Sequence, residues 1–330
     1  MNASRRGENR SGEAGREDQA GARSGDRLGS HDESAAPVEP IAEDGLPSIA
    51  SVIRRHGLTA RKALGQNFLL DLSLTRRIAR AAAQPLGVVV EIGPGPGGLT
   101  RALLMEGATR VIAVERDPRC LAALAEISER FPGRLTIVEG DALKIDPREH
   151  LERPSPADVD GGAQIVANLP YNIGTELLVR WLRGADDAEE RGPLWWRRAT
   201  VMLQREVAER VVAGTGEKAY GRLAVLTQRR ADARIAFDVS PKAFSPPPKV
   251  VSSILSLAPL TRPRFDAPLA AMEKVTAAAF SQRRKMLRSS LKSIAEDPEK
   301  LLAEADIAPT ERAENVAPEA FARIAASIGA

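Results

Sequence analysis

The regular alternation of short apolar strands with helices, which begins near residue 87, restricts the possible folds of this chain more than any other feature. The first apolar segment, VVVEI at 88–92, is β-branched and suits a strand buried on both faces of a parallel sheet. A segment with the apolar spacing of a helix follows this strand, and the strand–helix pattern then recurs along the chain. Further strands are expected at 110–115, 134–141, 164–168 and 199–204. Such alternation predicts a doubly wound sheet with right-handed crossovers.

The two ends of the sequence differ from this α/β region. Residues 1–45 are mostly Gly, Ser, Ala and charged residues, which bury too little apolar surface to offset the entropy of ordering. The segments 234–240 and 250–259 predict a closing antiparallel pair, and beyond Pro263 only helical patterns follow. We therefore expect three parts: a disordered polar tail (1–45), an α/β domain (46–263) and a small all-α domain (264–330).

Composition excludes several classes of protein. The apolar fraction of 43% and the charged fraction of 28% are typical of globular domains. No apolar run reaches the roughly 18 residues that cross a bilayer, and no apolar segment follows the N-terminal arginines, so we expect neither a membrane span nor a signal peptide. The single cysteine, Cys120, excludes an internal disulfide, and three histidines offer little to a metal site. A cytoplasmic protein without a metal is expected.

A glycine-rich loop, GPGPGG at 93–98, lies between the first strand and its helix, where a nucleotide site is expected. The same spacing also fits the dinucleotide fingerprint. Glu115 ends the second strand, where a carboxylate can bind both ribose hydroxyls. Asp141 ends the third strand, where a carboxylate can accept from an adenine amino group. These features indicate an adenosine-containing cofactor and leave nicotinamide and sulfonium chemistry both open.

The tetrapeptide NLPY at 168–171 ends the fourth strand, at the sheet edge where ligands bind in open α/β folds. An exocyclic base amine is a poor nucleophile because its lone pair is delocalised into the ring. Two acceptors aimed at its hydrogens, the side-chain oxygen of Asn168 and the backbone carbonyl of Pro170, would localise that lone pair toward an incoming methyl group. Tyr171 could hold a flipped base by stacking. This pattern favours methylation of adenine.

Positive charge is concentrated in the last third of the chain. Residues 240–292 contain ten Lys and Arg but two acidic residues, although the net charge of the whole chain is only +3. A clustered basic surface is typical of proteins that bind polyanions. The candidates for joint phosphate contacts are Arg283, Arg284, Lys285 and Arg288.

Eight segments together resemble the KsgA/RsmA family of ribosomal RNA adenine dimethyltransferases: LGQNFLLD, VEIGPGPGGLT, EGDA, NLPYNI, MLQREVAER, AYGRLAVLTQ, FSPPPKVVSSI and FSQRRKMLRSSL. The resemblance runs from about residue 50 to the C-terminus. It implies a Rossmann-like methyltransferase sheet that binds S-adenosylmethionine, followed by a small all-α domain that binds RNA. It further implies a monomer that dimethylates two adjacent adenosines near the 3′ end of small-subunit rRNA, with the precursor of that subunit as its partner.

The resemblance also assigns roles to individual donor-site residues. Asn67 and Leu69 would lie beside the methionine and adenosine portions of the donor, and Gly93 would lie behind the methionine portion. Glu115 would hold the ribose and Asp141 the adenine amine.

At the acceptor site, Asn168 would serve both donor closure and the target amine. Tyr171 would stack on the target base, and Phe244 would cover its other face.

Other functions remain open at this level. An NAD-dependent dehydrogenase would explain the glycine loop and Glu115, but not NLPY or the basic segment. A ribosome-assembly factor that binds RNA, with incidental methylation, would explain both. A methyltransferase of large-subunit rRNA would share the donor and NLPY elements.

Overall fold

The computed structural model describes residues 41–151, 162–184 and 194–329, so most of the expected disordered tail lies outside the described residues. Contacts divide the chain into two units, Met1–Val38 and Glu39–Ala330, and the fold described here is that of the second unit.

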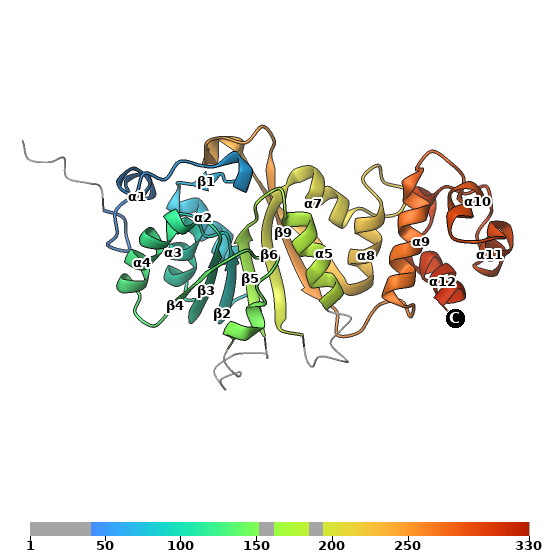
Figure 1. Ribbon diagram of the computed structural model, residues 1–330, viewed down its shortest axis with the longest axis horizontal. Coiled ribbons are helices and arrows are strands. Elements are labelled where there is room, and N and C mark those ends of the chain that lie inside the picture. The colour runs from blue at the N-terminus through green and yellow to red at the C-terminus, as the bar shows by residue number, and fades with distance from the viewer. Residues whose placement is uncertain (1–40, 152–161, 185–193, 330) are drawn as a thin grey trace, which may run out of the picture. The chain divides into compact units, whose positions relative to one another are not determined.

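A seven-stranded sheet with the order β4-β3-β2-β5-β6-β9-β7 forms the centre of this unit (Figure 1). Its strands are β2 (Val88–Ile92), β3 (Arg110–Glu115), β4 (Leu135–Glu139), β5 (Ala163–Asn168), β6 (Trp196–Gln204), β7 (Ala231–Val239) and β9 (Ser252–Pro259). The first five are parallel, whereas β9 runs antiparallel to both β6 and β7. The predicted parallel sheet and its closing antiparallel pair are thus confirmed.

Helices cover both faces of this sheet, because successive residues of its strands point to opposite sides. Val89 and Val111 share a core with α2 (Leu72–Ala81), α3 (Gly98–Met105) and α4 (Leu121–Arg130). Val90 and Ile112 share another with α5 (Gly174–Gly184) and α7 (Arg205–Val212). The strand order reverses between β2 and β5, and the carboxyl ends at such a switch point form a ligand crevice.

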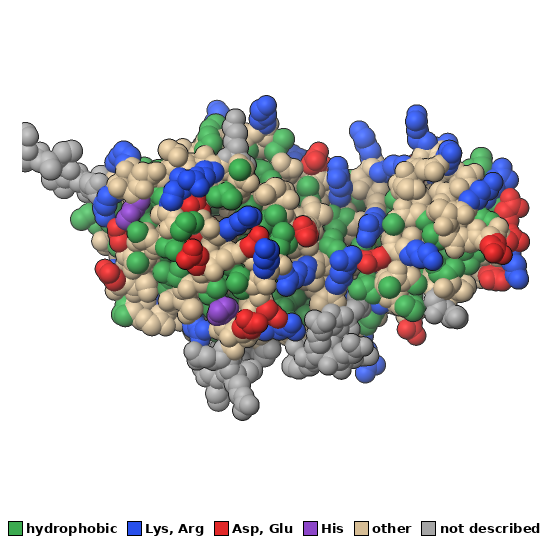
Figure 2. Space-filling view, in the orientation of Figure 1, with side chains coloured by type: hydrophobic (Ala, Val, Ile, Leu, Met, Phe, Trp, Pro, Cys, Tyr) green, Lys and Arg blue, Asp and Glu red, His purple; other side chains and the backbone are tan. Residues whose placement is uncertain are grey.

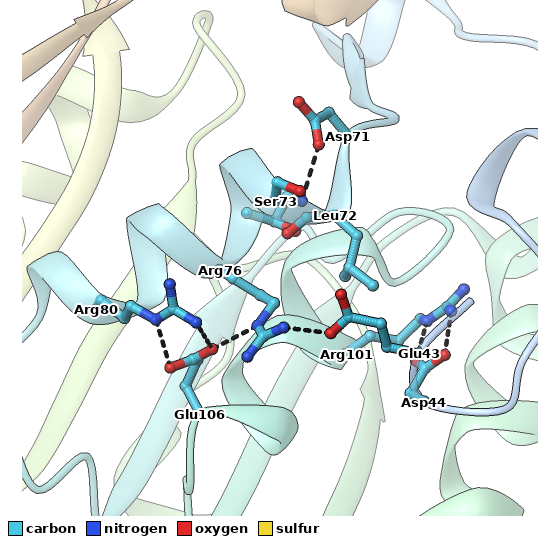
Figure 3. A network of polar contacts seen from close by, with 10 residues as sticks. Glu43, Asp44, Asp71, Leu72, Ser73, Arg76, Arg80, Arg101 and Glu106 are labelled. Atoms are coloured by element: carbon cyan, nitrogen blue, oxygen red, sulfur yellow. Dashed lines mark hydrogen bonds and ion pairs between the residues drawn. The ribbon is translucent and has the colours of Figure 1, made fainter.

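The described chain begins with a segment that α2 and α3 hold in place. Asp44 and Arg101 are both buried and form a two-pronged ion pair, with 2.5 Å from Arg101 Nη2 to Asp44 Oδ1 (Figure 3). Glu43 pairs with Arg76 beside it. The expectation of disorder up to residue 45 was therefore wrong for residues 41–45, because a buried partner outside the segment fixes Asp44. Ser48 then caps α1 (Ile49–Arg55).

Asp71 caps α2, because its carboxylate accepts from the backbone N–H groups of Ser73 and Leu74. Immediately before it, residues 64–69 run across the sheet edge, and we call them the strap. The strap contains β1 (Phe68–Leu69), which pairs with β8 (Phe244–Ser245) in a separate two-stranded sheet. This pairing ties the strap to the connection between β7 and β9.

The C-terminal part is helical, as expected. It contains α9 (Leu269–Ser281), α10 (Leu287–Ser290), α11 (Pro298–Glu304) and α12 (Pro318–Gly329). Its core also includes Tyr220 and Val225, the latter on α8 (Arg222–Arg230), so it takes in residues that precede the expected boundary at 263/264. That boundary stays a prediction. Among the described residues, no helix is long and apolar enough to cross a membrane.

Candidate functional site

A pocket lies at the carboxyl ends of β2, β3, β4 and β5, bounded on its outer side by the strap. Eight of the residues singled out from the sequence line it together: Asn67, Leu69, Gly93, Glu115, Asp141, Asn168, Pro170 and Tyr171. The structure therefore brings the donor and acceptor residues into one cavity, although their segments are far apart in sequence.

The glycine loop leaves the floor of this pocket without side chains. Gly93 and Gly95 have φ of 68° and 56°, a conformation that disfavours other residues. A Cβ atom at Gly95 would lie 3.1 Å from Cε1 of Phe68, and one at Gly98 would lie 3.0 Å from the Leu69 carbonyl oxygen. The loop and the strap can approach this closely only because these positions are glycines.

Glu115 is buried at the end of β3, and the local backbone orients its carboxylate. Oε2 accepts from the N–H of Gly95 at 2.8 Å, and Oε1 accepts from the N–H of Asp117 at 2.7 Å. Burial raises the pKa of this carboxyl, and the two backbone hydrogen bonds oppose that shift. Each carboxylate oxygen has further acceptor capacity, which suits a pair of ribose hydroxyls.

Asp141 lies at the end of β4 and is oriented by the N–H of Leu143, 3.0 Å from its Oδ1. Its other oxygen is 3.3 Å from Nη1 of Arg116, which also lines the pocket. No sequence signal pointed to Arg116, since a lone arginine after an acidic strand end is ordinary. An adenine amino group bound at Asp141 would therefore lie close to a guanidinium group.

Two side-chain hydrogen bonds hold the strap against the sheet edge. Gln66 Nε2 donates to Asp117 Oδ2 at 3.0 Å, and the bond from Arg119 lowers the pKa of Asp117 to about 2. Asn168 Nδ2 donates to the Asn67 carbonyl oxygen at 3.1 Å. Gln66 belongs to the LGQNFLLD segment, but the resemblance assigned roles only to Asn67 and Leu69 of that segment.

The same contact from Asn168 to the strap defines how its amide is turned. Because Nδ2 is engaged by the strap, Oδ1 is the atom left to accept from a ligand. Within the described part of the chain, no hydrogen bond to this oxygen is found. This orientation agrees with the expected role of Asn168 as an acceptor.

The expectation for Pro170 was wrong in one respect. Its carbonyl oxygen is not free, because it accepts from the N–H groups of Ile173 at 3.1 Å and Gly174 at 3.0 Å where α5 begins. The preceding carbonyl, that of Leu169, accepts no hydrogen bond from the residues described, and Leu169 lines the pocket. Leu169 therefore supplies the available acceptor, while the Pro170 ring packs against Gly93.

The two aromatic candidates occupy different environments. Tyr171 lines the pocket, and its hydroxyl lies 2.5 Å from Oγ of Ser252. Phe244 is only 5% exposed, is not among the lining residues, and packs with Val239 and Ile254 in the core. In this structure Phe244 is a packing residue opposite Leu69, so the expectation that it covers a base is not supported.

The four basic candidates lie after α9 and do not line the pocket. Arg284 and Lys285 are exposed. Arg283 forms an ion pair with Glu314 at 2.8 Å and donates to the Lys218 carbonyl, and Arg288 lies 3.5 Å from Glu299. Two of the four are therefore engaged within the protein.

A second depression, the basic groove, adjoins the pocket through Asn172, which lines both. It runs between α5, α7, α8 and Arg283. Its cationic residues are Arg180, Arg183, Arg210, Lys218, Arg222 and Arg283, against the acidic Glu176, Glu206 and Glu209. Lys and Arg side chains are visible over this part of the molecule in Figure 2. Apart from Arg283, these cations were missed because they are dispersed over three segments.

No group of three or more His, Cys, Asp or Glu that could hold a metal ion is found within residues 41–151, 162–184 and 194–329.

The sheet, the glycine loop and the acidic strand ends, together with NLPY in the same pocket, fit the Rossmann-like class of S-adenosylmethionine-dependent methyltransferases. Two solved structures share the fold. A dimethyladenosine transferase from Plasmodium falciparum matches with a TM-score of 0.60 and 24% identity, covering 78% of this chain and 95% of that one. The 23S rRNA methyltransferase ErmE matches with a TM-score of 0.57 and 26% identity, covering 80% and 100%.

Sequence comparison defines the family. The model for ribosomal RNA adenine dimethylase matches residues 57–329, and the chain belongs to that family. It is 56% identical over 289 residues to the ribosomal RNA small subunit methyltransferase A of Azorhizobium caulinodans, covering 87% of this chain and 95% of that protein. It is 57% identical over 285 residues to the protein of the same name from Xanthobacter autotrophicus, covering 86% and 94%. The resemblance stated from the sequence is confirmed, and the dehydrogenase alternative is excluded.

Proposed function

We propose that this enzyme uses S-adenosylmethionine to dimethylate the exocyclic amines of two adjacent adenosines near the 3′ end of 16S rRNA, in the cytoplasm and late in small-subunit assembly. It acts as a monomer on the precursor of the small subunit. The names of its relatives support the small subunit as the partner. The observation that carries the proposal is the single pocket in which Asn168–Tyr171 face the glycine loop, Glu115 and Asp141.

The donor half of this pocket fits S-adenosylmethionine by the chemistry of its lining. Side-chain-free glycines admit the methionine portion, Glu115 accepts from the ribose hydroxyls, and Asp141 accepts from the adenine amine. When bound, the donor supplies an electrophilic methyl group on a sulfonium. No protein nucleophile is needed, because holding the two substrates in line provides most of the catalysis.

At the acceptor half, two oxygens are available to a target amine. Asn168 Oδ1 and the Leu169 carbonyl would accept hydrogen bonds from its two hydrogens. The nitrogen lone pair, otherwise delocalised into the ring, would then be localised toward the donor methyl group. Tyr171 would hold the flipped base by stacking, worth about 1–3 kcal/mol. Methyl transfer would form the new C–N bond and break the bond between sulfur and the methyl group, so that S-adenosylhomocysteine leaves and one N–H proton of the amine passes to water.

The flanking RNA would follow the basic groove, which shares Asn172 with the pocket. Phosphates would be held by its cations, and the exposed Arg284 and Lys285 would extend the same surface. Such interactions supply affinity and register without reading the base sequence.

The test is methyl transfer from labelled S-adenosylmethionine to under-methylated small subunits. Asn168→Ala removes one of the two acceptors and is expected to lower kcat by about 100-fold or more. Glu115→Ala is expected to weaken donor binding by about 10- to 100-fold, measured by calorimetry, because it removes hydrogen bonds to a charged group. Asn315→Ala, at an exposed amide bonded to Glu311, is the control and should behave as wild type.

The same assay addresses the other candidates. The match to ErmE makes large-subunit rRNA a second possible substrate. Activity on large-subunit RNA and none on small subunits would overturn the proposal. If an inactive but donor-binding Asn168→Ala variant restored small-subunit maturation in cells, RNA binding in assembly would be the primary role, with methylation incidental.

A further inference from the structure

The hydroxyl of Tyr171 is held by a serine of the FSPPPKVVSSI segment, to which the sequence assigned no role. Tyr171 lies in the loop between β5 and α5, and its oxygen is 2.5 Å from Oγ of Ser252. Ser252 is the first residue of β9 and is fully buried. Strand pairing fixes its position on both sides, opposite Gln204 of β6 and Val239 of β7.

This hydrogen bond fastens the Tyr171 ring at both of its ends. The backbone at one end is set by the Pro170 turn, whose carbonyl starts α5. The phenol oxygen at the other end is set by a rigid strand. A side chain held only at Cβ can change rotamer, whereas one also held at its tip cannot do so without breaking the hydrogen bond. The ring is therefore preorganised before any ligand arrives.

We propose that Ser252 is a positioning residue that fixes the direction of the Tyr171 side chain, and with it the position of the ring, for stacking on the target base. The proposal rests on the proposed function of Tyr171 as the stacking residue. Stacking requires the ring to lie at a defined position beside the base. Because the hydrogen bond already exists in the folded protein, the free energy of ordering the side chain is met during folding and not during each methyl transfer. Ser252 itself touches neither donor nor base.

A purely structural role, in which Ser252 only satisfies a half-buried phenol, makes a different prediction. It would change stability and leave the kinetics of the folded enzyme unaltered. The positioning role instead predicts a loss in kcat/KM for small subunits, with the affinity for S-adenosylmethionine unchanged.

Two variants remove the same hydrogen bond from opposite sides. Tyr171→Phe keeps the ring and Ser252→Ala keeps the phenol, and each should lower kcat/KM by about 2- to 10-fold. The double variant should lose no more than either single one, because only one interaction exists to be removed. Ser253→Ala is the matched control on the same strand, since its hydroxyl donates to Asp238 at 2.6 Å and lies outside the pocket lining.

Ring mobility can be measured directly because the chain contains two tyrosines, Tyr171 and Tyr220. Incorporation of 3-fluorotyrosine gives two fluorine resonances, and Tyr171→Phe assigns them. Ser252→Ala should shift and broaden the Tyr171 resonance alone. Tyr220, whose hydroxyl donates to the Val316 carbonyl at 2.9 Å, is the internal control.

The outcomes separate this inference from the proposed function. A mobile Tyr171 ring together with the expected kinetic loss supports it. An unchanged Tyr171 resonance, or unchanged kcat/KM in both single variants, overturns it. Full activity of Tyr171→Ala would instead overturn the stacking role of Tyr171. If Ser252→Ala fails to fold, Tyr171→Phe alone decides, because its unaltered kcat/KM would equally refute positioning.

Discussion

At the scale of single residues, the pocket contains a second buried acid, Glu91, beside the expected Glu115. Glu91 lies on β2, is 1% exposed, and accepts from the Thr100 hydroxyl at 2.6 Å. Burial raises its pKa to about 8, because the charged form loses its hydration, while the Thr100 bond opposes this shift. Near neutral pH this carboxyl is therefore mostly protonated.

The raised pKa of Glu91 predicts a dependence of stability on pH. The folded state binds this proton more tightly than the unfolded chain does, so the stabilisation is fully present below about pH 4.5 and is lost as the pH rises through about 8. Glu91→Gln mimics the protonated acid and should remove this decline. Urea unfolding at pH 5 and pH 8 measures it. Glu139→Gln, on an exposed acid of β4, should retain the wild-type decline, and an equal decline in Glu91→Gln would contradict the assignment.

At the scale of elements, the turn from β2 into α3 leaves little space for a larger residue. Gly97 caps α3 with φ of 87°, and a Cβ there would lie 2.1 Å from Cδ1 of Ile127 on α4. Gly107, just after α3, has φ of 95° but no atom within 4 Å of that point. The two glycines thus share a left-handed backbone and differ in the space around them.

Alanine at these two positions separates backbone strain from packing. Gly107→Ala should cost about 1–2 kcal/mol for the left-handed conformation alone. Gly97→Ala adds overpacking against α4 and should cost about 1–3 kcal/mol more. Denaturant unfolding of both variants gives the difference directly. Equal losses would mean that Ile127 moves aside without penalty.

Elements whose signals are local could be predicted from the sequence. The strand VVVEI, the cap at Asp71 and the glycine turn are each encoded within a few residues. The carbonyl of Pro170 could not be assigned from such local signals. Whether that oxygen is free depends on the residue at which α5 starts. Phe244 and Asp44 are harder still, since their burial depends on Leu69 and Arg101, which are distant in sequence.

At the scale of the whole α/β and helical unit, the basic groove could not be predicted from the sequence, because its residues are also distant from one another in the chain. Its cations come from α5, from α7, from the start of α8 and from the turn after α9. None of the first three segments is strongly basic by itself, so charge counting found only the last. The surface becomes evident only when the fold brings these segments together.

The groove predicts how binding to small subunits responds to salt. Arg210→Gln with Lys218→Gln removes two cations from the groove and should reduce the slope of log affinity against log salt by about 0.7–0.9 for each phosphate that is no longer neutralised. Arg262→Gln with Lys300→Gln removes the same charge from exposed positions that do not line the groove. Salt titrations of both double variants should therefore differ, and identical slopes would exclude the groove as the RNA path.

The pairing of β1 with β8 also has a consequence for how the protein is made. The strap that bounds the donor pocket is synthesised early, but its partner strand, Phe244–Ser245, and the Ser252 that holds Tyr171 come only after the parallel strands are complete. A growing chain can thus form its glycine loop and acidic strand ends long before it can close the pocket over them. Donor binding should appear abruptly, once β8 has emerged from the ribosome that is translating it.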